Sequence, residues 1–275
     1  MGFYLLHTTR LSMVWRDSEM AMGWVFPCQA ARNFLDAAAC LAYLGGNRNF
    51  RNGPPMPALQ RIDQALMALI GLVLVLSVAI YFVSTDYFSL RFAAEDGPVE
   101  YGTAICLFVA CLILLRNGFA LRGKATKLAV GLTFFYAFAF FFGAGEEISW
   151  GQRIFGWETS EAMKAINRQD ETTLHNIEIG GVAMTKHLFG PVLTAAILIY
   201  LVVLPLLYSR VTWVTNFVNR IALPVPGMRH AIMAVLASLV ITFIDVDRKW
   251  EVYELIFGLL VVSIFLLPQN REHTS

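Results

Sequence analysis

Six long apolar runs separated by polar links form the dominant pattern along this chain. The runs cover approximately residues 66–84, 99–115, 128–145, 187–208, 230–244 and 250–268. Because the hydrocarbon core of a bilayer is about 30 Å thick and needs about 20 apolar residues in a helix, each run predicts a transmembrane helix. The fifth run has only 15 residues, or roughly 22 Å of helix, so it crosses only where the bilayer thins or where its end is buried in protein. The predicted fold is an all-α polytopic membrane helical bundle of about six transmembrane helices.

The composition supports this fold class. Of the 275 residues, 57% are hydrophobic and 15% are charged, and the mean hydropathy of +0.59 is too high for a soluble domain of this size. The net charge of +1 shows no basic excess of the kind that nucleic-acid binding requires. The cysteines Cys28, Cys40, Cys106 and Cys111 are too few for a disulfide framework, so we interpret them as packing residues.

Charged residues alternate from link to link and predict the orientation. Two links contain no acid: one carries four basic residues between 116 and 127, and the other carries three between 210 and 229. Fifteen of the 20 acids lie in the other three links and in the helix ends beside them. Because short cytoplasmic loops retain Lys and Arg, the basic links and both termini are predicted to be cytoplasmic.

Residues 1–64 differ from the rest of the chain. They contain no apolar run long enough to span a membrane and no signal-peptide cleavage pattern, and they include turn-rich clusters at 45–49 and 53–55. We interpret them as a poorly ordered cytoplasmic arm before a transmembrane domain at 65–268 and a cytoplasmic tail at 269–275. A second interpretation is that the natural start is Met56, since the residues after it resemble a short basic flank of the first span.

The third apolar run ends in the string GEEISWGQR at 145–153. Its adjacent carboxylates, Glu146 and Glu147, lie at the lipid boundary, where an unpaired charge is costly. If the helix continues, Glu146, Trp150 and Arg153 share one face. One acid then pairs with Arg153, and the other serves as a ligand or a proton acceptor. The simpler interpretation is that Arg153 neutralises two acids that only cap the interface.

The second external link supplies further polar candidates. Ser160 is a predicted N-cap for a short interfacial helix over 161–167. Glu171 and His175 are spaced i, i+4, which on a helix brings a carboxylate beside an imidazole, as in a metal site or an oriented general base. Such a pair is also common among solvated side chains. His187 begins the fourth run on the same side of the membrane. With two external histidines, a zinc site made of three histidines is excluded.

The last external turn leads directly into the sixth run. Glu254 lies one turn inside that run, where a carboxylate usually faces a cavity or a partner. The simpler interpretation is that Glu251 and Glu254 interact with the helix dipole. Five of the six runs thus carry polar or ionisable residues at their external ends: Glu100, Glu146, Glu147, His187, Asp245, Glu251 and Glu254. We predict one site, in which Glu146 or Glu147, His175, and Glu251 or Glu254 approach one another.

Three strings resemble a pattern of uncharacterised bacterial multi-span inner-membrane proteins. They are EDGPVE at 95–100, GEEISWGQRIFG at 145–156 and ETTLHN at 171–176. The resemblance implies a bacterial inner-membrane setting and carries no assigned activity. Membrane hydrolases of the alkaline ceramidase type use three zinc-binding histidines, and this chain falls short of that pattern.

Three functions are compatible with these features. The first is an enzyme acting on a lipid or lipid-linked head group at the external leaflet, with the catalytic candidates Glu146, Glu147, Arg153, His175 and Glu254. Its cofactor would be a divalent metal ion such as Mg, Mn, Fe or Zn, with the ligand candidates Glu147, Glu171, His175, His187 and Glu251. The second is a proton- or cation-coupled transporter component. The third is a non-catalytic scaffold subunit whose acidic face binds a protein partner in the membrane. Membrane lipids are expected partners in each case, and nucleic acid in none.

Overall fold

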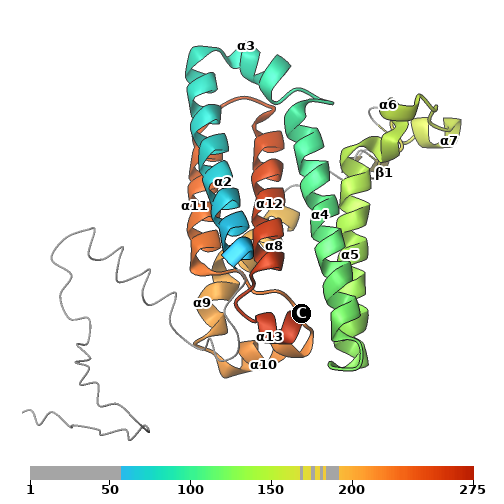
Figure 1. Ribbon diagram of the computed structural model, residues 1–275. Helices are drawn as coiled ribbons and strands as arrows, with labels where there is room; N and C mark the ends of the chain where they lie inside the picture. The colour runs from blue at the N-terminus through green and yellow to red at the C-terminus, as the bar shows by residue number, and fades with distance from the viewer. Residues whose placement is uncertain (1–56, 168–169, 175–176, 180–181, 184–191) are drawn as a thin grey trace, which may run out of the picture. The chain divides into compact units, whose positions relative to one another are not determined.

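The computed structural model describes residues 57–167, 170–174, 177–179, 182–183 and 192–275 (Figure 1). The long helices of this part of the chain are α2 (Pro57–Val83), α4 (Pro98–Leu121), α5 (Lys127–Glu147), α11 (Met228–Phe243) and α12 (Lys249–Leu266). A further apolar helix continues through α8 (Leu193–Leu198), the π-helix η4 (Ile199–Val203) and α9 (Leu204–Tyr208). Each predicted apolar run coincides with a helix where the run is described.

Within the described ranges, three helices are long and apolar enough to cross a membrane: α2 from Ala58, α4 and α5. The apolar segments 193–208 and 228–243 are shorter, and α12 carries three charged residues in its first two turns. Crossing by these last helices, and with it the six-span topology, stays a prediction. Helix α2 begins at Pro57, so the domain boundary predicted at residue 65 falls inside it.

Short elements occupy the connections. They are α3 (Thr85–Tyr87), η1 (Phe88–Phe92), η2 (Ser149–Gly151), α6 (Gln152–Phe155), α7 (Glu161–Lys164), the antiparallel pair β1 (Glu178–Ile179) and β2 (Val182–Ala183), α10 (Thr212–Arg220) and α13 (Arg271–Thr274). The helix predicted over 161–167 is present as the single turn α7, in which Ser160 accepts a hydrogen bond from the Met163 N–H. The location of α7 at a membrane surface stays a prediction.

Helix α12 forms the centre of the bundle and packs against α2, α4 and α11 (Figure 1). Every residue from Gly258 to Phe265 is buried. The only polar side chain in this stretch is Ser263. A helix that is apolar on all sides is stable only when protein or lipid covers every side. Here the neighbouring helices cover α12. The composition of α12 thus accounts for its central position.

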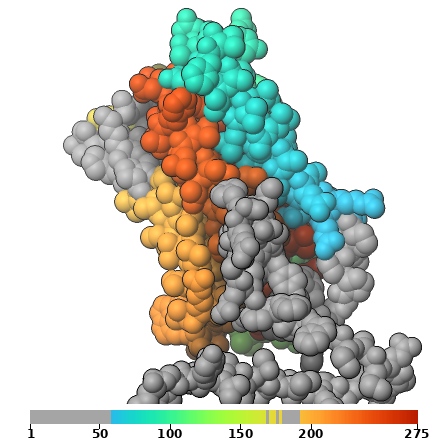
Figure 2. Space-filling view, turned by 90° about the vertical axis from the view of Figure 1, so that its left-hand side faces the viewer, coloured from blue at the N-terminus to red at the C-terminus, as the bar shows by residue number. Residues whose placement is uncertain are grey.

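The outer faces of the surrounding helices are apolar and exposed. Leu72, Val75 and Phe82 of α2 and Leu239 of α11 are between 52% and 71% exposed. Figure 2 shows α2 and α11 side by side on one such face, with the α3–η1 segment at one end of it. Contiguous exposed apolar surface marks a membrane or partner contact. Together with helices long enough to span a bilayer, it indicates a lipid-facing surface.

A buried polar cluster joins α2, α11 and α12 near the end opposite to the acidic links. The Ser263 hydroxyl donates to Asp63 Oδ1 at 2.5 Å, and His230 Nε2 lies 2.8 Å from Ser263 Oγ. The Gly227 N–H donates to His230 Nδ1 at 2.8 Å, so the neutral imidazole carries its proton on Nε2 and donates to Ser263. Arg229 adds an ion pair of 3.1 Å to Asp63. This direction of donation excludes His230 as a base for a Ser263 nucleophile.

Residues 269–275, predicted as a cytoplasmic tail, pack against the connection between α10 and α11. Asn270 is 2% exposed; it accepts from the Val225 N–H and donates to the Leu223 carbonyl, each at 2.9 Å. Gln269 donates to the Pro226 carbonyl at 2.6 Å. These bonds satisfy backbone groups of a segment with two prolines, which cannot satisfy them within a helix.

Helix α12 approaches α4 closely at Gly258. A Cβ atom at this position would lie 2.9 Å from the Cβ atom of Cys106. Gly258→Ala is therefore expected to push α12 away from α4 and to lower the free energy of unfolding by about 1–3 kcal/mol. Thermal unfolding of the detergent-purified protein measures this change.

Gly71→Ala in α2 is the matched control, because a Cβ atom there would meet no described atom within 4 Å. Its melting temperature should equal or exceed that of the wild type, since alanine favours helix more than glycine does. An equal loss of stability in both variants would contradict the close contact at Gly258.

Candidate functional site

The acidic links gather at one end of the bundle, and Arg153 holds three of their carboxylates together in the described part of the chain. Its guanidinium forms ion pairs with Glu95, at 3.2 Å, and with Asp96 and Glu171. Glu171 is 6% exposed, and a carboxylate that is buried to this degree needs a charged partner. Arg153 therefore joins residues of all three strings that resemble the bacterial pattern.

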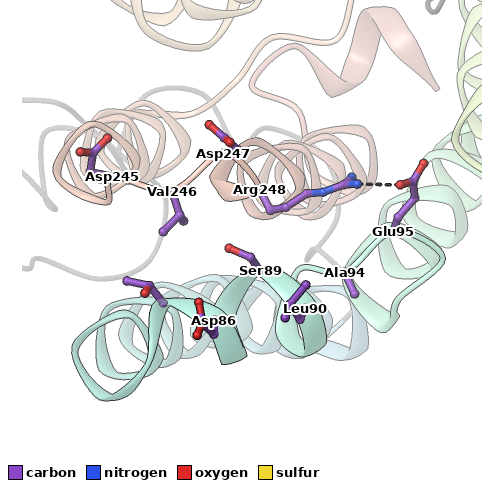
Figure 3. A pocket seen from close by; sticks show the side chains of 10 residues that line it. Asp86, Ser89, Leu90, Ala94, Glu95, Asp245, Val246, Asp247 and Arg248 are labelled. Atoms are coloured by element: carbon purple, nitrogen blue, oxygen red, sulfur yellow. Dashed lines mark hydrogen bonds and ion pairs between the residues drawn. The ribbon is translucent and has the colours of Figure 1, made fainter. Parts of the chain in front are cut away.

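Arg248 extends this network to the turn before α12. Its guanidinium contacts Glu95 at 2.6 Å, as Figure 3 shows, and Glu251 at 3.2 Å. Glu95 accepts from Arg153 through Oε1 and from Arg248 through Oε2. The ion pairs form a continuous chain in the order Glu171, Arg153, Glu95, Arg248 and Glu251.

The network determines the charge state of its members. Partial burial raises the pKa of Glu95, but the hydrogen bond and charge of Arg248, followed by those of Arg153, outweigh burial and hold this pKa below its ordinary value. Partial burial disfavours the charged form of Arg248, yet the hydrogen bond and charge of Glu95 outweigh it and raise the Arg248 pKa. Burial acts on Arg153 in the same way, and its hydrogen bond to Asp96 and the charge of Glu171 raise its pKa. All three groups are charged at neutral pH.

Helix α5 ends at Glu147, so the condition under which Glu146, Trp150 and Arg153 would share one helical face is not met. Residues 149–151 instead have positive φ angles of 46°, 54° and 79°. Left-handed backbone is unfavourable for serine and for tryptophan. This turn therefore depends on tertiary contacts that hold it.

Trp150 supplies such contacts. Its ring centroid lies 5.3 Å from that of Phe142, and its Nε1–H donates to Glu146 Oε1 at 2.9 Å. The ring also covers Gly145, where a Cβ atom would lie 2.8 Å from it. Trp150 thus folds back onto the last turns of α5, and the glycine of this string leaves room for the indole.

Glu146 and Gln152 hold the link that follows α7. Glu146 Oε2 accepts from the Leu174 N–H at 2.6 Å, and Gln152 Oε1 accepts from the Thr172 N–H at 3.0 Å. Both acceptors belong to the string GEEISWGQRIFG, and both donors belong to ETTLHN. The two strings are thus parts of one folded unit.

The predicted metal ligands have different outcomes in the structure. Glu171 and Glu251 pair with arginines. Residues 171–174 are not helical, and the predicted pairing of Glu171 with His175 involves a residue outside the described ones, so it stays a prediction. His175 and His187 lie outside the described residues. Among the residues that the structure describes, no group of three His, Cys, Asp or Glu side chains is placed to hold a metal ion. The metal site stays a prediction.

A cluster of carboxylates lies at the same end of α4, α5 and α12. Glu254 is within electrostatic range of Glu147, Glu251 and Glu100. Glu254 is accessible at the molecular surface, whereas the other three are half-buried. The predicted convergence of these acids with His175, which lies outside the described residues, stays a prediction.

An open pocket of about 660 Å³ lies beside Arg248. In Figure 3, Asp86 and Ser89 from the α3–η1 segment lie across the pocket from the 245–248 turn. Neither Asp86 nor Arg248 is a site candidate from the sequence alone, and the same holds for Glu95. In the sequence, only the high number of charged residues in their links points to these three residues.

Comparison of the chain with protein-family models, with curated proteins and with solved structures finds no match. A function must therefore be inferred from the site itself. Among the residues that the structure describes, the ionic network contains four carboxylates and two guanidinium groups, a formal charge of −2. A negative cluster of this kind favours cations over anions.

Glu95→Gln tests the contribution of the network to stability. At neutral pH it removes the negative partner that Arg153 and Arg248 share, and it should lower the free energy of unfolding by about 1 kcal/mol. The folded pKa of Glu95 is below its ordinary value of 4.5, so this contribution is present above that value and is lost as pH falls through the folded pKa. The difference in melting temperature between the wild type and Glu95→Gln should shrink below pH 4.5.

Glu161→Gln is the control for this series, because Glu161 is exposed and pairs with the neighbouring Lys164 at 2.9 Å. Melting curves from neutral to acidic pH, recorded for the wild type and both variants, provide the comparison. A loss in Glu95→Gln that does not change with pH would contradict the ion-pair assignment.

Proposed function

We propose that this protein is an integral membrane enzyme that acts on a lipid or lipid-linked head group at the extracytoplasmic leaflet of a bacterial inner membrane. The observation that supports this proposal is the electrostatic interaction between Glu147 of α5 and Glu254 of α12 at one end of a bundle with helices long enough to span a membrane. Two carboxylates that interact in this way can take different roles in one reaction. Such a pair supplies a general acid and a general base.

The proposed roles divide between this pair and the residues around it. Glu147 and Glu254 are the acid–base pair. Arg153 is a positioning residue, because carboxylates of the protein occupy its guanidinium. Glu146 is also a positioning residue, since it holds the Leu174 N–H. His175 follows Leu174 in the sequence, and we keep it as a candidate acid, base or ligand.

A divalent cation is the proposed cofactor because the site is negative and the proposed substrates include phosphate-bearing head groups. Carboxylate oxygens such as those of Glu147 and Glu251 suit Mg or Mn, whereas His175 or His187 in the ligand set would favour Zn or Fe. The cation would screen the repulsion among the acids and would bind the phosphate of the head group.

Glu147→Gln and Glu254→Gln test the proposed enzyme. Each substitution removes one titrating group of the pair at nearly constant volume, so either should lower turnover by about 100-fold or more. Because the substrate is a membrane lipid, mass spectrometry of lipids and lipid-linked precursors in cells that express each variant measures the effect. Wild-type expression should change the amount of one lipid species, and both variants should abolish that change at equal protein level.

Glu161→Gln serves again as the control, and it should act as the wild type does. Elemental analysis of the purified proteins identifies the metal in the same series, with loss expected in Glu147→Gln. An unchanged lipid profile in cells expressing the wild type would count against the enzyme.

A proton- or cation-coupled transporter component is the second candidate. The cluster of Asp63, His230 and Ser263 supports it, because it adds ionisable groups at the end of the bundle opposite to the acids. Ser263 lies nine residues after Glu254 on α12, or about 13 Å along the helix axis. Polar groups near both ends of one central helix are a requirement of a relay across a membrane. A transporter would leave the lipid profile unchanged and would acidify or alkalinise the lumen of loaded vesicles.

The proposed topology has six spans with both termini in the cytoplasm. Lys124→Cys and Glu161→Cys, each in a background without the natural cysteines, test it with an impermeant thiol reagent added outside intact cells. Both positions are exposed on the protein, so access depends on the side of the membrane. The reagent should label position 161 and leave position 124 unlabelled; the reverse result would invert the orientation.

A further inference from the structure

The short helix α10 lies across the ends of the long helices at the end of the bundle where the basic links gather (Figure 1). Its inner face is buried through Val214 and Val218, which form one apolar cluster with Val225. Tyr208 fixes the start and the end of the helix: its carbonyl accepts from the Thr215 hydroxyl, and its own hydroxyl donates to Asn219 at 3.0 Å. Helix α10 is thus held at a defined orientation on the bundle.

The outer face of α10 carries two exposed aromatic side chains. Trp213 and Phe217 are 72% and 55% exposed, and their rings stack at a centroid distance of 6.2 Å and an angle of 24°. This i, i+4 pair forms a continuous apolar surface on a helix whose inner face is already buried. Amphipathic helices of this type lie in the plane of a membrane, with aromatic rings at head-group depth.

Exposed arginines lie at both ends of the aromatic pair. Arg210 precedes α10 and Arg220 ends it, and both are exposed. Between residues 116 and 127 and between 210 and 229 the sequence has seven basic residues and no acid. Helix α13, which packs against α10, adds Arg271 and Glu272, so the described surface around α10 keeps a positive charge.

The basic link between α4 and α5 continues this surface. Ala222, which follows α10, packs in one cluster with Leu121 and Ala129 on either side of that link. In the same link, the Arg122 guanidinium lies over the rings of Phe119 and Phe134, at 4.5 and 5.1 Å from their centroids. A cation above aromatic rings at a helix end is a second group suited to the interface of a bilayer.

We propose that α10 is an interfacial helix that binds the head groups of anionic phospholipids in the cytoplasmic leaflet. Trp213 and Phe217 insert at the boundary between head groups and acyl chains, and Arg210 and Arg220 contact the phosphates. The binding surface of α10 is defined by these four residues. This inference is independent of the proposed enzyme, because it concerns the opposite end of the bundle.

Charge complementarity favours lipid over a second copy of the chain. A two-fold interface would bring the same positive surface of two copies together, so arginines would face arginines. An anionic leaflet attracts each of these side chains instead, by about a factor of five per basic residue near the surface.

The test uses the full-length protein in detergent, titrated with short-chain phosphatidylglycerol or phosphatidylcholine and followed by native mass spectrometry. The wild type should bind phosphatidylglycerol more tightly than phosphatidylcholine. The Arg210→Gln/Arg220→Gln variant should lose about 30-fold in affinity for phosphatidylglycerol, which corresponds to about 2 kcal/mol, and should keep its affinity for phosphatidylcholine. Trp213→Ala/Phe217→Ala should weaken the binding of both lipids.

Arg91→Gln and Trp250→Ala are matched controls, because both side chains are exposed and lie at the acidic end of the bundle. Neither should change lipid affinity. Free glycerol phosphate distinguishes a lipid site from a plain anion site, and it should not compete. Equal affinities of the arginine variant and the wild type would overturn the proposal. A protein dimer that disappears in Trp213→Ala/Phe217→Ala would overturn it in favour of a protein interface.

Discussion

The acidic end of this protein depends on the carboxylate of Glu95, which two arginines share. One side chain accepts from two arginines that lie 58 and 153 residues away in the sequence. Arg153 belongs to the segment after α5, and Arg248 immediately precedes α12. Glu95 therefore links the two parts of the chain that carry the candidate acid–base pair. Near a bilayer the dielectric is low, and ion pairs that would contribute little in open water contribute more. The position of Glu147 relative to Glu254 therefore depends on a residue that belongs to neither of their helices.

The helices could be predicted from the sequence because their apolar content and length are local properties. The central place of α12 also has a local signal, since Gly258–Phe265 shows no polar face. The end of α5 has no such signal: serine and tryptophan at 149 and 150 disfavour left-handed backbone, and the turn is stable because Trp150 packs on Phe142 and bonds to Glu146. A turn that is stabilised by tertiary contacts cannot be read from local preferences.

The candidate site, like the fold, could be predicted from the sequence only in part. Acids at helix ends could be identified from charge and the apolar runs alone, and Glu147 lies within electrostatic range of Glu254. The pairing of these acids with arginines could not be predicted, because ion-pair partners that are far apart in the sequence leave no periodic pattern. The polar cluster of Asp63, His230 and Ser263 was equally hidden: Asp63 and Ser263 are 200 residues apart, and a single serine in an apolar run usually bonds to its own helix.

The central position of α12 has a consequence for the order of assembly in the cell. The α4–α5 hairpin can pack as soon as it has been synthesised, whereas α2 and α4 reach their shared partner only when α12 emerges. Leu266 lies 183 residues after Val83, which at roughly 5–20 residues per second is about 10–40 s of translation. During that interval the faces of α2 and α4 that later contact α12 have lipid or the insertion machinery as neighbours. The core of this bundle therefore closes as a late event, and nascent chains arrested before α12 expose surfaces that quality-control proteases of the membrane can recognise.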